Sequence, residues 1–261
     1  MKVKKVSIIG VNSLNKIATI ICNYNYGKYV CDAIKSAVDQ TYEDHIVVVV
    51  DDGSTDDSLD RIQGMYNDWT VTHSCGQVIW RRGNLIVAGT SNKGASEARN
   101  LAIRIAGPVF AIHVLDADDE AMPDKVKIMA EKMLSHNSIG VVYGDYIIDR
   151  GTYKKIEYKK PYSYDGLIRE CIVHSGSLVR KAYLEAVTKD NQYYNPKLHG
   201  PASQGYIGSV EDYDLWLRLS RVCMIVHIPQ VLTYVREHGE NQSMKMTNEI
   251  FAKAREIMNN V

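Results

Sequence analysis

Asp51-Asp52-Gly53-Ser54-Thr55-Asp56 directly follows the apolar run Ile46-Val47-Val48-Val49-Val50, and these two adjoining stretches decide the fold. An unbroken, Val-rich run is typical of a central parallel strand that is covered on both faces. A second acidic stretch, Asp116-Ala117-Asp118-Asp119, follows the apolar run 109–115 in the same way. Ligands of open α/β sheets bind beyond the carboxyl ends of the strands. The two acidic stretches are therefore predicted to face one crevice.

These carboxylates indicate a particular kind of chemistry. Grouped Asp side chains supply hard oxygen ligands that suit Mg²⁺ or Mn²⁺, and such a cation suits the phosphates of a nucleotide. The three acids between 116 and 119 also repel one another unless a cation is present. The sequence thus predicts chemistry on a phosphorylated substrate. Helix capping and Asx turns are the competing explanation, since Asp, Ser and Thr are common before the first turn of a helix.

The overall composition narrows the class of protein. The chain has 261 residues, 45% of them apolar, and its 31 basic and 31 acidic residues give a formal net charge of zero. This balance argues against a nucleic-acid binding protein, which usually carries a basic excess. There is no apolar run long enough for a transmembrane helix, no convincing signal peptide and no Cys pair at metal-binding or redox spacing. We expect a protein with reduced thiols, either free in the cytoplasm or peripheral at the inner membrane face.

Strands and helices are predicted to alternate along the first half of the chain. Apolar runs predict four strands, at 17–22, 46–50, 84–87 and 109–115. Apolar residues at i, i+3 and i+4 predict three helices, at 30–38, 58–65 and 98–105. This alternation favours a doubly wound, mostly parallel sheet flanked by helices. The rest of 66–90 is predicted to be a loop, and the first dozen residues are expected to add an edge strand.

The second half is less regular. A helix is predicted to begin with Pro123 as its first residue, because proline suits that position. Further elements are predicted as a strand at 140–145, a loop at 150–166, a helix at 212–219, a strand at 222–235 and a helical tail at 247–261. There is no internal repeat and no low-complexity linker, so 1–261 is predicted to be a single domain.

The order of these motifs resembles family 2 glycosyltransferases. The resemblance begins with 19–30, 37–42 and 50–56 and continues through Asn92-Lys93-Gly94 and Ala98-Arg99-Asn100. It then includes 115–119 with Pro123, and ends with 211–219 and 234–238. Each motif is weak alone, but together they cover roughly residues 16–240 in the right order.

The resemblance implies a GT-A fold and a nucleotide-sugar donor, most often a UDP-sugar, with Mn²⁺ or Mg²⁺ as cofactor. Residues 16–120 would hold the donor and 121–240 the acceptor, which could be a glycan, a lipid-linked sugar or a protein. The implied reaction transfers the sugar to a hydroxyl with inversion, as in polysaccharide or glycoconjugate synthesis. A catalytically silent relative that binds only nucleotide or carbohydrate is the alternative. No P-loop or dinucleotide-binding motif is present, which argues against a P-loop NTPase and against a dinucleotide-dependent oxidoreductase.

The resemblance also implies roles for individual residues. Asn23 and Tyr24 would contact the base, Asp51 and Asp52 the base and ribose, and Lys93 the base or a phosphate. An aromatic ring stacked on a base contributes about 1–3 kcal/mol.

A second group of residues would carry out the transfer. Asp118 would bind the metal, Asp116 the ribose or the metal, and His238 would complete the metal shell. Asp212 would be the catalytic base, because single displacement requires a base on the face opposite the leaving group. Arg236 is a further candidate for a phosphate contact, and the Tyr-rich segment between 143 and 164 a candidate surface for acceptor sugars.

Overall fold

A computed structural model describes residues 15–74, 77–198 and 210–239 of the chain. Four parallel strands form the centre of its sheet, in the order β5 (Leu85–Gly89), β2 (His45–Asp51), β1 (Ile17–Asn23) and β6 (Ala111–Asp116). In the register of these strands Asn23 lies level with Asp51, and Cys22 with Asp116. Both acidic stretches therefore leave the sheet at the same edge, as the sequence predicted.

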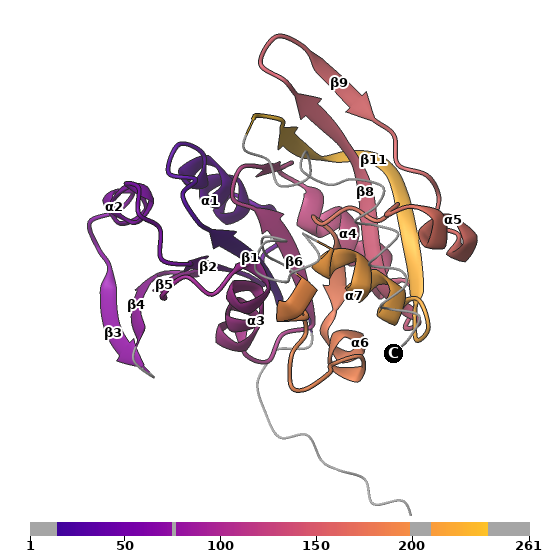
Figure 1. The fold of residues 1–261 in the computed structure, drawn as a ribbon, viewed down its shortest axis with the longest axis horizontal. Coiled ribbons are helices and arrows are strands. Elements are labelled where there is room, and N and C mark those ends of the chain that lie inside the picture. The colour runs from indigo at the N-terminus through magenta and orange to yellow at the C-terminus, as the bar shows by residue number, and fades with distance from the viewer. Residues whose placement is uncertain (1–14, 75–76, 199–209, 240–261) are drawn as a thin grey trace, which may run out of the picture.

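Helices cover both faces of this parallel block (Figure 1). On one face, α1 (Val30–Val38) and α2 (Ser58–Gly64) pack against alternate strand residues such as Ile21, Val47 and Val49. On the other face, α3 (Ala95–Ala106) packs against Ile20 and Val48. Alternate residues of one strand point to opposite faces, so strands buried on both sides need the continuous apolar runs seen in the sequence. The predicted doubly wound arrangement is confirmed.

The second half of the chain extends the same sheet. The short strand β10 (Leu178–Arg180) runs antiparallel between β6 and β8 (Ile139–Asp149). Parallel to β8 lies β11 (Met224–Arg236), whose end pairs with β7 (Glu120–Ala121). The helices of this half, with a short 3₁₀ turn at Pro196–Leu198, are α4 (Lys125–Leu134), α5 (Tyr164–Arg169), α6 (Lys181–Ala186) and α7 (Glu211–Leu219). Because β11 returns beside β7, the last strand ends next to the acidic stretch that follows β6.

Three sequence predictions are wrong or incomplete. The predicted loop in 66–90 contains a hairpin, β3 (Thr70–Ser74) and β4 (Gln77–Arg82), which extends the sheet at one end (Figure 1). Its outer strand is exposed and polar, so it lacks the apolar run that marks a buried strand. Within 150–166, β9 (Lys154–Glu157) pairs with β8, and α5 begins at Tyr164.

The start of α4 also differs from the prediction. Pro123 lies in a turn before the helix, where its carbonyl accepts a hydrogen bond from the Thr41 N–H at 3.1 Å. The helix begins at Lys125, whose N–H already bonds to the Met122 carbonyl. The expected N-terminal edge strand and the helical tail at 247–261 lie outside the described residues.

A short chain of polar side chains crosses the parallel strands inside the core. The Thr19 hydroxyl is hydrogen-bonded to His45 Nε2 at 2.7 Å and to His113 Nδ1 at 2.9 Å. Burial lowers the pKa of His45 to about 4 and, with the charges of Lys125 and other groups nearby, holds the pKa of His113 well below its usual range. Both imidazoles are therefore neutral in the folded protein at neutral pH.

The buried histidines should make the protein less stable in acid. Between pH 6.5 and about 4, His45 is protonated in the unfolded chain but stays neutral in the folded chain. The free energy of unfolding therefore decreases as the pH falls. For His45 this amounts to about 2 kcal/mol between pH 7 and 5. We expect His45→Gln to lose that part of the pH dependence, measured by denaturant unfolding at both pH values. The exposed His73→Gln is the control, and an equal change in the two variants would contradict the prediction.

Candidate active site

The first part of the site is the junction between the ends of β1 and β2. Asp51 is 2% exposed and accepts hydrogen bonds from Asn23 Nδ2 at 2.7 Å, from the Ser54 hydroxyl at 2.7 Å and from the Ser54 N–H at 2.9 Å. Asp51 thus fixes the loop that follows β2, through bonds to a serine three residues further along the chain. The remaining amide oxygen of Asn23 is buried and has no hydrogen-bond partner within the described residues. It offers an acceptor to a ligand at this edge.

Asp52 holds the next loop in place. Its two carboxylate oxygens accept hydrogen bonds from the N–H groups of Lys93 at 2.9 Å and Gly94 at 2.8 Å. Gly53, in the loop after β2, has φ +72°. It passes so close to the loop after β5 that a Cβ on it would lie 2.7 Å from the Asn92 nitrogen. Asp52 therefore lies beside Lys93, which was also predicted to contact the donor. Its carboxylate, however, is bound to the backbone of the loop that contains Lys93 and Gly94.

Two predicted contact residues expose their side chains at the same edge. Tyr24 is 44% exposed, and the Lys93 side chain is also exposed. Next to Tyr24, Asn25 adopts a left-handed backbone with φ 60° and accepts the Thr55 N–H at 2.7 Å. The turn after β1 is thereby fixed against the loop after β2, which leaves the Tyr24 ring accessible to a planar ligand.

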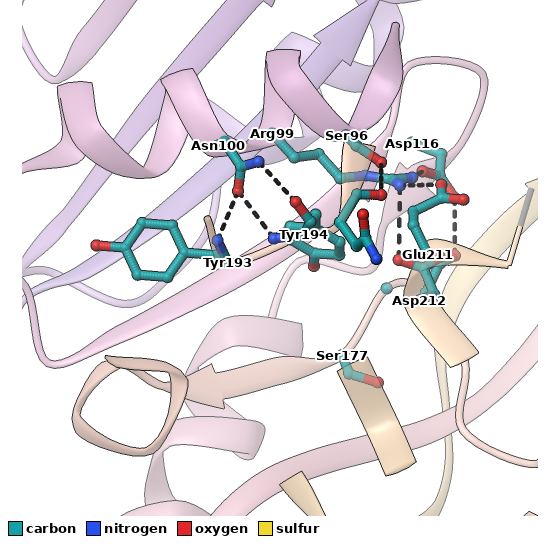
Figure 2. Close-up of polar contacts among 12 residues, drawn as sticks. Ser96, Arg99, Asn100, Asp116, Ser177, Tyr193, Tyr194, Glu211 and Asp212 are labelled. Carbon is teal, nitrogen blue, oxygen red and sulfur yellow. Dashed lines mark hydrogen bonds and ion pairs between the residues drawn. The ribbon is translucent and has the colours of Figure 1, made fainter. Parts of the chain in front are cut away.

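Arg99, on α3, connects the two halves of the site (Figure 2). Its guanidinium lies 3.3 Å from Asp116 Oδ1 and 3.5 Å from Asp212 Oδ1, and it is hydrogen-bonded to Glu211. Burial opposes the charge of Arg99, but Asp212, Glu211 and Asp116 outweigh this effect and raise its pKa well above the usual value. One cation thus holds carboxylates from the end of β6 and from the start of α7.

Neighbouring contacts fix this cation in place. Asn100 accepts hydrogen bonds from the N–H groups of Tyr193 and Tyr194 and donates to the Tyr194 carbonyl at 2.8 Å (Figure 2). The Tyr194 ring lies 5.4 Å from the Arg99 guanidinium carbon. On the opposite side, the Ser175 hydroxyl donates to Asp116 Oδ2 at 2.8 Å. Both oxygens of Asp116 are therefore engaged by side chains of this chain.

The acidic stretch after β6 meets the end of β11. Asp118 Oδ2 lies 3.2 Å from His238 Nε2, and the Asp118 carbonyl accepts a hydrogen bond from Arg236 at 2.9 Å. Burial, together with the charge of Asp116, raises the pKa of Asp118, and the same two causes with Asp118 raise that of Asp119 well above its usual range. A bound cation would relieve this strain between buried like charges.

Aromatic rings and a further cation surround this pair. The His238 ring stacks on Tyr29 with centroids 4.9 Å apart and meets Tyr26 edge-on at 5.7 Å. Arg236 is paired with Glu120 and, at 3.1 Å, with Asp32. These contacts fix the end of β11 against α1 and so place the His238 imidazole beside Asp118.

Asp118 and His238 are the residues best placed to hold a metal ion. Within 15–74, 77–198 and 210–239, no three His, Cys, Asp or Glu side chains are grouped as ligands of one ion. Two protein ligands are nevertheless enough for Mg²⁺ or a similar cation, which takes its other ligands from water and substrate phosphates. Asp116, the third predicted ligand, lies nearby but is bound to Arg99 and Ser175.

Some residues of the site were not selected from the sequence. Arg99 was part of the Ala98-Arg99-Asn100 motif, and the place of this motif in the order of motifs was the available signal. Lys125 was missed entirely, although it is fully buried and donates to the Thr233 hydroxyl at 2.7 Å. Burial lowers the pKa of Lys125 to about 7, while Asp119 and Asp116 act in the opposite direction. A lysine in an amphipathic helix pattern gives no sign that it faces inward.

The fold and the candidate site define an α/β protein with clustered acidic side chains at the carboxyl ends of its parallel strands. The model of the family described as glycosyl transferase family 2 matches residues 18–189, and the chain belongs to this family. The resemblance seen in the sequence is thereby confirmed.

Among curated relatives, chondroitin synthase of Escherichia coli is 29% identical over 247 residues, which are 94% of this chain and 32% of that protein. Hyaluronan synthase of Pasteurella multocida is 25% identical over 90% of this chain and 22% of that protein. The chain therefore spans about a third or less of the length of these relatives.

Solved structures confirm the GT-A fold. Staphylococcus aureus TarS 1–349 in complex with UDP-GlcNAc superposes with a TM-score of 0.66 at 19% identity, over 93% of this chain and 65% of that one. The mannosyltransferase PcManGT of Pyrobaculum calidifontis, in complex with GDP-Man and Mn²⁺, has a TM-score of 0.62 at 17% identity, over 92% and 64% of the two chains. No helix among the described residues is both long and apolar enough to cross a membrane.

Removal of the Arg99 charge should destabilise the fold. Arg99→Gln would leave Asp116, Glu211 and Asp212 close together without a cation, and breaking a buried ion pair in this way costs about 3–5 kcal/mol. Denaturant unfolding would measure the loss. Arg104→Gln, on an exposed position of the same helix, should change stability by less than about 0.5 kcal/mol. Similar values for both variants would show that Arg99 is not the central cation.

Proposed function

We propose that the protein is a metal-assisted, inverting glycosyltransferase that moves a sugar from a UDP-sugar to a hydroxyl of an acceptor. The observation that carries the proposal is the Arg99 bridge, which holds Asp116 beside the donor edge and Asp212 at the start of α7. A base for the acceptor and a site for the donor phosphates would thus lie on two sides of one fixed cation.

The proposed reaction is a single displacement. The acceptor oxygen attacks the anomeric carbon, a new C–O bond forms, and the bond from that carbon to the phosphate oxygen breaks. The nucleoside diphosphate leaves with the electron pair, and Asp212 takes the proton of the acceptor hydroxyl. Arg99 would keep Asp212 in place while the two substrates bind. A base that is already positioned lowers the entropic cost of reaching the transition state.

The donor would occupy the edge formed by β1, β2 and β6. Tyr24 would stack on the base, while Asn23 and the loops shaped by Asp51 and Asp52 would take the base and ribose. Lys93 is exposed and could reach a phosphate. Asp118 and His238 would hold Mn²⁺ or Mg²⁺, and this cation, when bound, neutralises charge on the departing diphosphate.

The known proteins support, at a coarser level, the choice of donor and product. Two of the solved neighbours are complexes, one with UDP-GlcNAc and one with GDP-Man and Mn²⁺, and two of the curated relatives are a chondroitin synthase and a hyaluronan synthase. We therefore propose a UDP-sugar as donor and a growing glycan as acceptor, with 16–120 holding the first and 121–240 the second. A cytoplasmic location stays a prediction of the sequence.

Loss of the proposed base should abolish turnover but leave nucleotide binding intact. General bases contribute about 10²–10⁴-fold to rate, so Asp212→Asn should lower kcat at least about a hundredfold in a UDP-release assay. Asp214→Asn removes a carboxylate from the same helix, where it is paired with Arg218, and should retain activity. Unchanged turnover in Asp212→Asn would contradict the assignment.

Nucleotide binding should depend on the metal and on Asp118. Calorimetry of UDP, GDP, dTDP and CDP, each with and without Mn²⁺, should show Mn²⁺-dependent binding of UDP. We expect Asp118→Asn to weaken that binding at least about tenfold, since one metal ligand is lost, whereas the exposed Asp124→Asn should bind as the wild type does. A folded protein that binds no nucleotide would instead support the catalytically silent alternative.

A further inference from the structure

A cavity of about 540 Å³ that is widely open to solvent lies beside β8 and β11, outside the proposed donor site. Its walls come from Asp145 of β8, from the start of β11 around His227, and from the segment 158–162 that follows β9. Cavities of this size hold small ligands. Tyr158 and Tyr162 supply aromatic rings, and Tyr158 is 72% exposed. None of the proposed steps of the transfer uses this cavity.

The cavity contains a buried polar pair. Asp145 is 2% exposed. Its Oδ1 is hydrogen-bonded to His227 Nε2 at 2.7 Å and accepts a hydrogen bond from the backbone N–H of Lys159 at 2.8 Å. Within the described part of the chain, both of these bonds use Oδ1, so Oδ2 is left to accept a ligand hydroxyl. Ring faces together with a few fixed polar groups are suited to a pyranose, which has apolar C–H faces and a rim of hydroxyls.

One of the residues that line the cavity is a lysine, Lys159, whose ammonium group has no carboxylate partner among the described residues. The segment 150–160 has five basic residues, and four of them pair with carboxylates: Arg150 with Glu237, Lys154 with Asp149, Lys155 with Glu157 and Lys160 with Glu170. Lys159 is the exception, since no carboxylate of a described residue lies within ion-pair distance of its ammonium group. A half-buried cation of this kind favours an anionic ligand.

Contacts lead from Lys159 to the proposed active site. The Lys159 ammonium lies 6.0 Å from the centre of the Tyr146 ring, and that ring lies 4.6 Å from the ring of His174. The next residue, Ser175, donates to Asp116 Oδ2 at 2.8 Å. The cavity is thus connected by packed side chains to the acidic stretch after β6.

We propose that this cavity binds an anionic sugar of the acceptor glycan, away from the hydroxyl that receives the new sugar. Tyr158 and Tyr162 would pack against the sugar rings, Asp145 and His227 would bind hydroxyls, and Lys159 would pair with the negative group. This inference rests on the proposed transfer to a glycan and specifies the acceptor as an acidic one.

Direct binding to the full chain tests the proposal. The probes are a hexasaccharide of alternating glucuronate and N-acetylhexosamine, the same compound with its carboxyl groups reduced to alcohols, and a phosphorylated neutral hexasaccharide. We expect the wild type to bind a charged probe and to bind the reduced compound at least about fivefold more weakly, as loss of a charged hydrogen bond implies. The two charged probes separate carboxylate from phosphate as the favoured group.

Matched variants locate the binding. Lys159→Gln should weaken binding of the charged probe at least about fivefold, and Tyr158→Ala should weaken this binding as well. Lys155→Gln removes a lysine from the same segment that is paired with Glu157, and should leave binding unchanged. Equal effects of the two lysine variants, equal binding of charged and reduced probes, or no binding of either charged probe would overturn the proposal.

Nucleotide binding in the same samples keeps the two proposals apart. All three variants should bind UDP with Mn²⁺ as the wild type does, which also shows that they are folded. UDP binding without saccharide binding would reject the cavity as an acceptor site and leave the transferase intact. Saccharide binding that depends on Lys159, in a protein that binds no nucleotide, would support the cavity and reject the transferase.

Discussion

The Arg99 guanidinium is the interaction on which the rest of the site depends. Three carboxylates, Asp116, Glu211 and Asp212, converge on it from two elements that are distant in sequence. Buried carboxylates without a cation would repel one another and disfavour the folded state. Asn100 and the Tyr194 ring fix the position of α3 next to this cation, so the packing of one helix determines how the end of β6 and the start of α7 face each other.

The parallel core could be predicted from the sequence because of a physical regularity. Strands covered on both faces need unbroken apolar runs, and the carboxyl ends of parallel strands share one edge of the sheet. The positions of Asp51 and Asp116 followed from these two facts. The hairpin of β3 and β4 did not, since an edge strand with exposed residues such as Val71 needs no apolar run.

Side-chain partners were harder to predict than strand positions. Arg99 contacts Asp116 and Glu211, which are 17 and 112 residues away in sequence, and no periodic pattern encodes a pairing over such distances. The same holds for Lys125, which is buried below the acidic stretch although its helix pattern shows only a surface lysine. The order of motifs indicated which residues to consider for the candidate site, but the roles of Asp51 and Asp52 in shaping loops required the folded geometry.

The position of β11 in the sheet determines when, during synthesis of the chain, the site can form. The strand lies between β8 and β7, and its end brings Arg236 and His238 to Asp118. A chain leaving the ribosome carries both acidic stretches well before residue 238 has been synthesised. Until then one edge of β8 lacks its neighbour and Asp118 lacks its imidazole. The proposed metal pair therefore cannot form before residue 238 has been synthesised, and a chain that is stopped before that residue cannot assemble it.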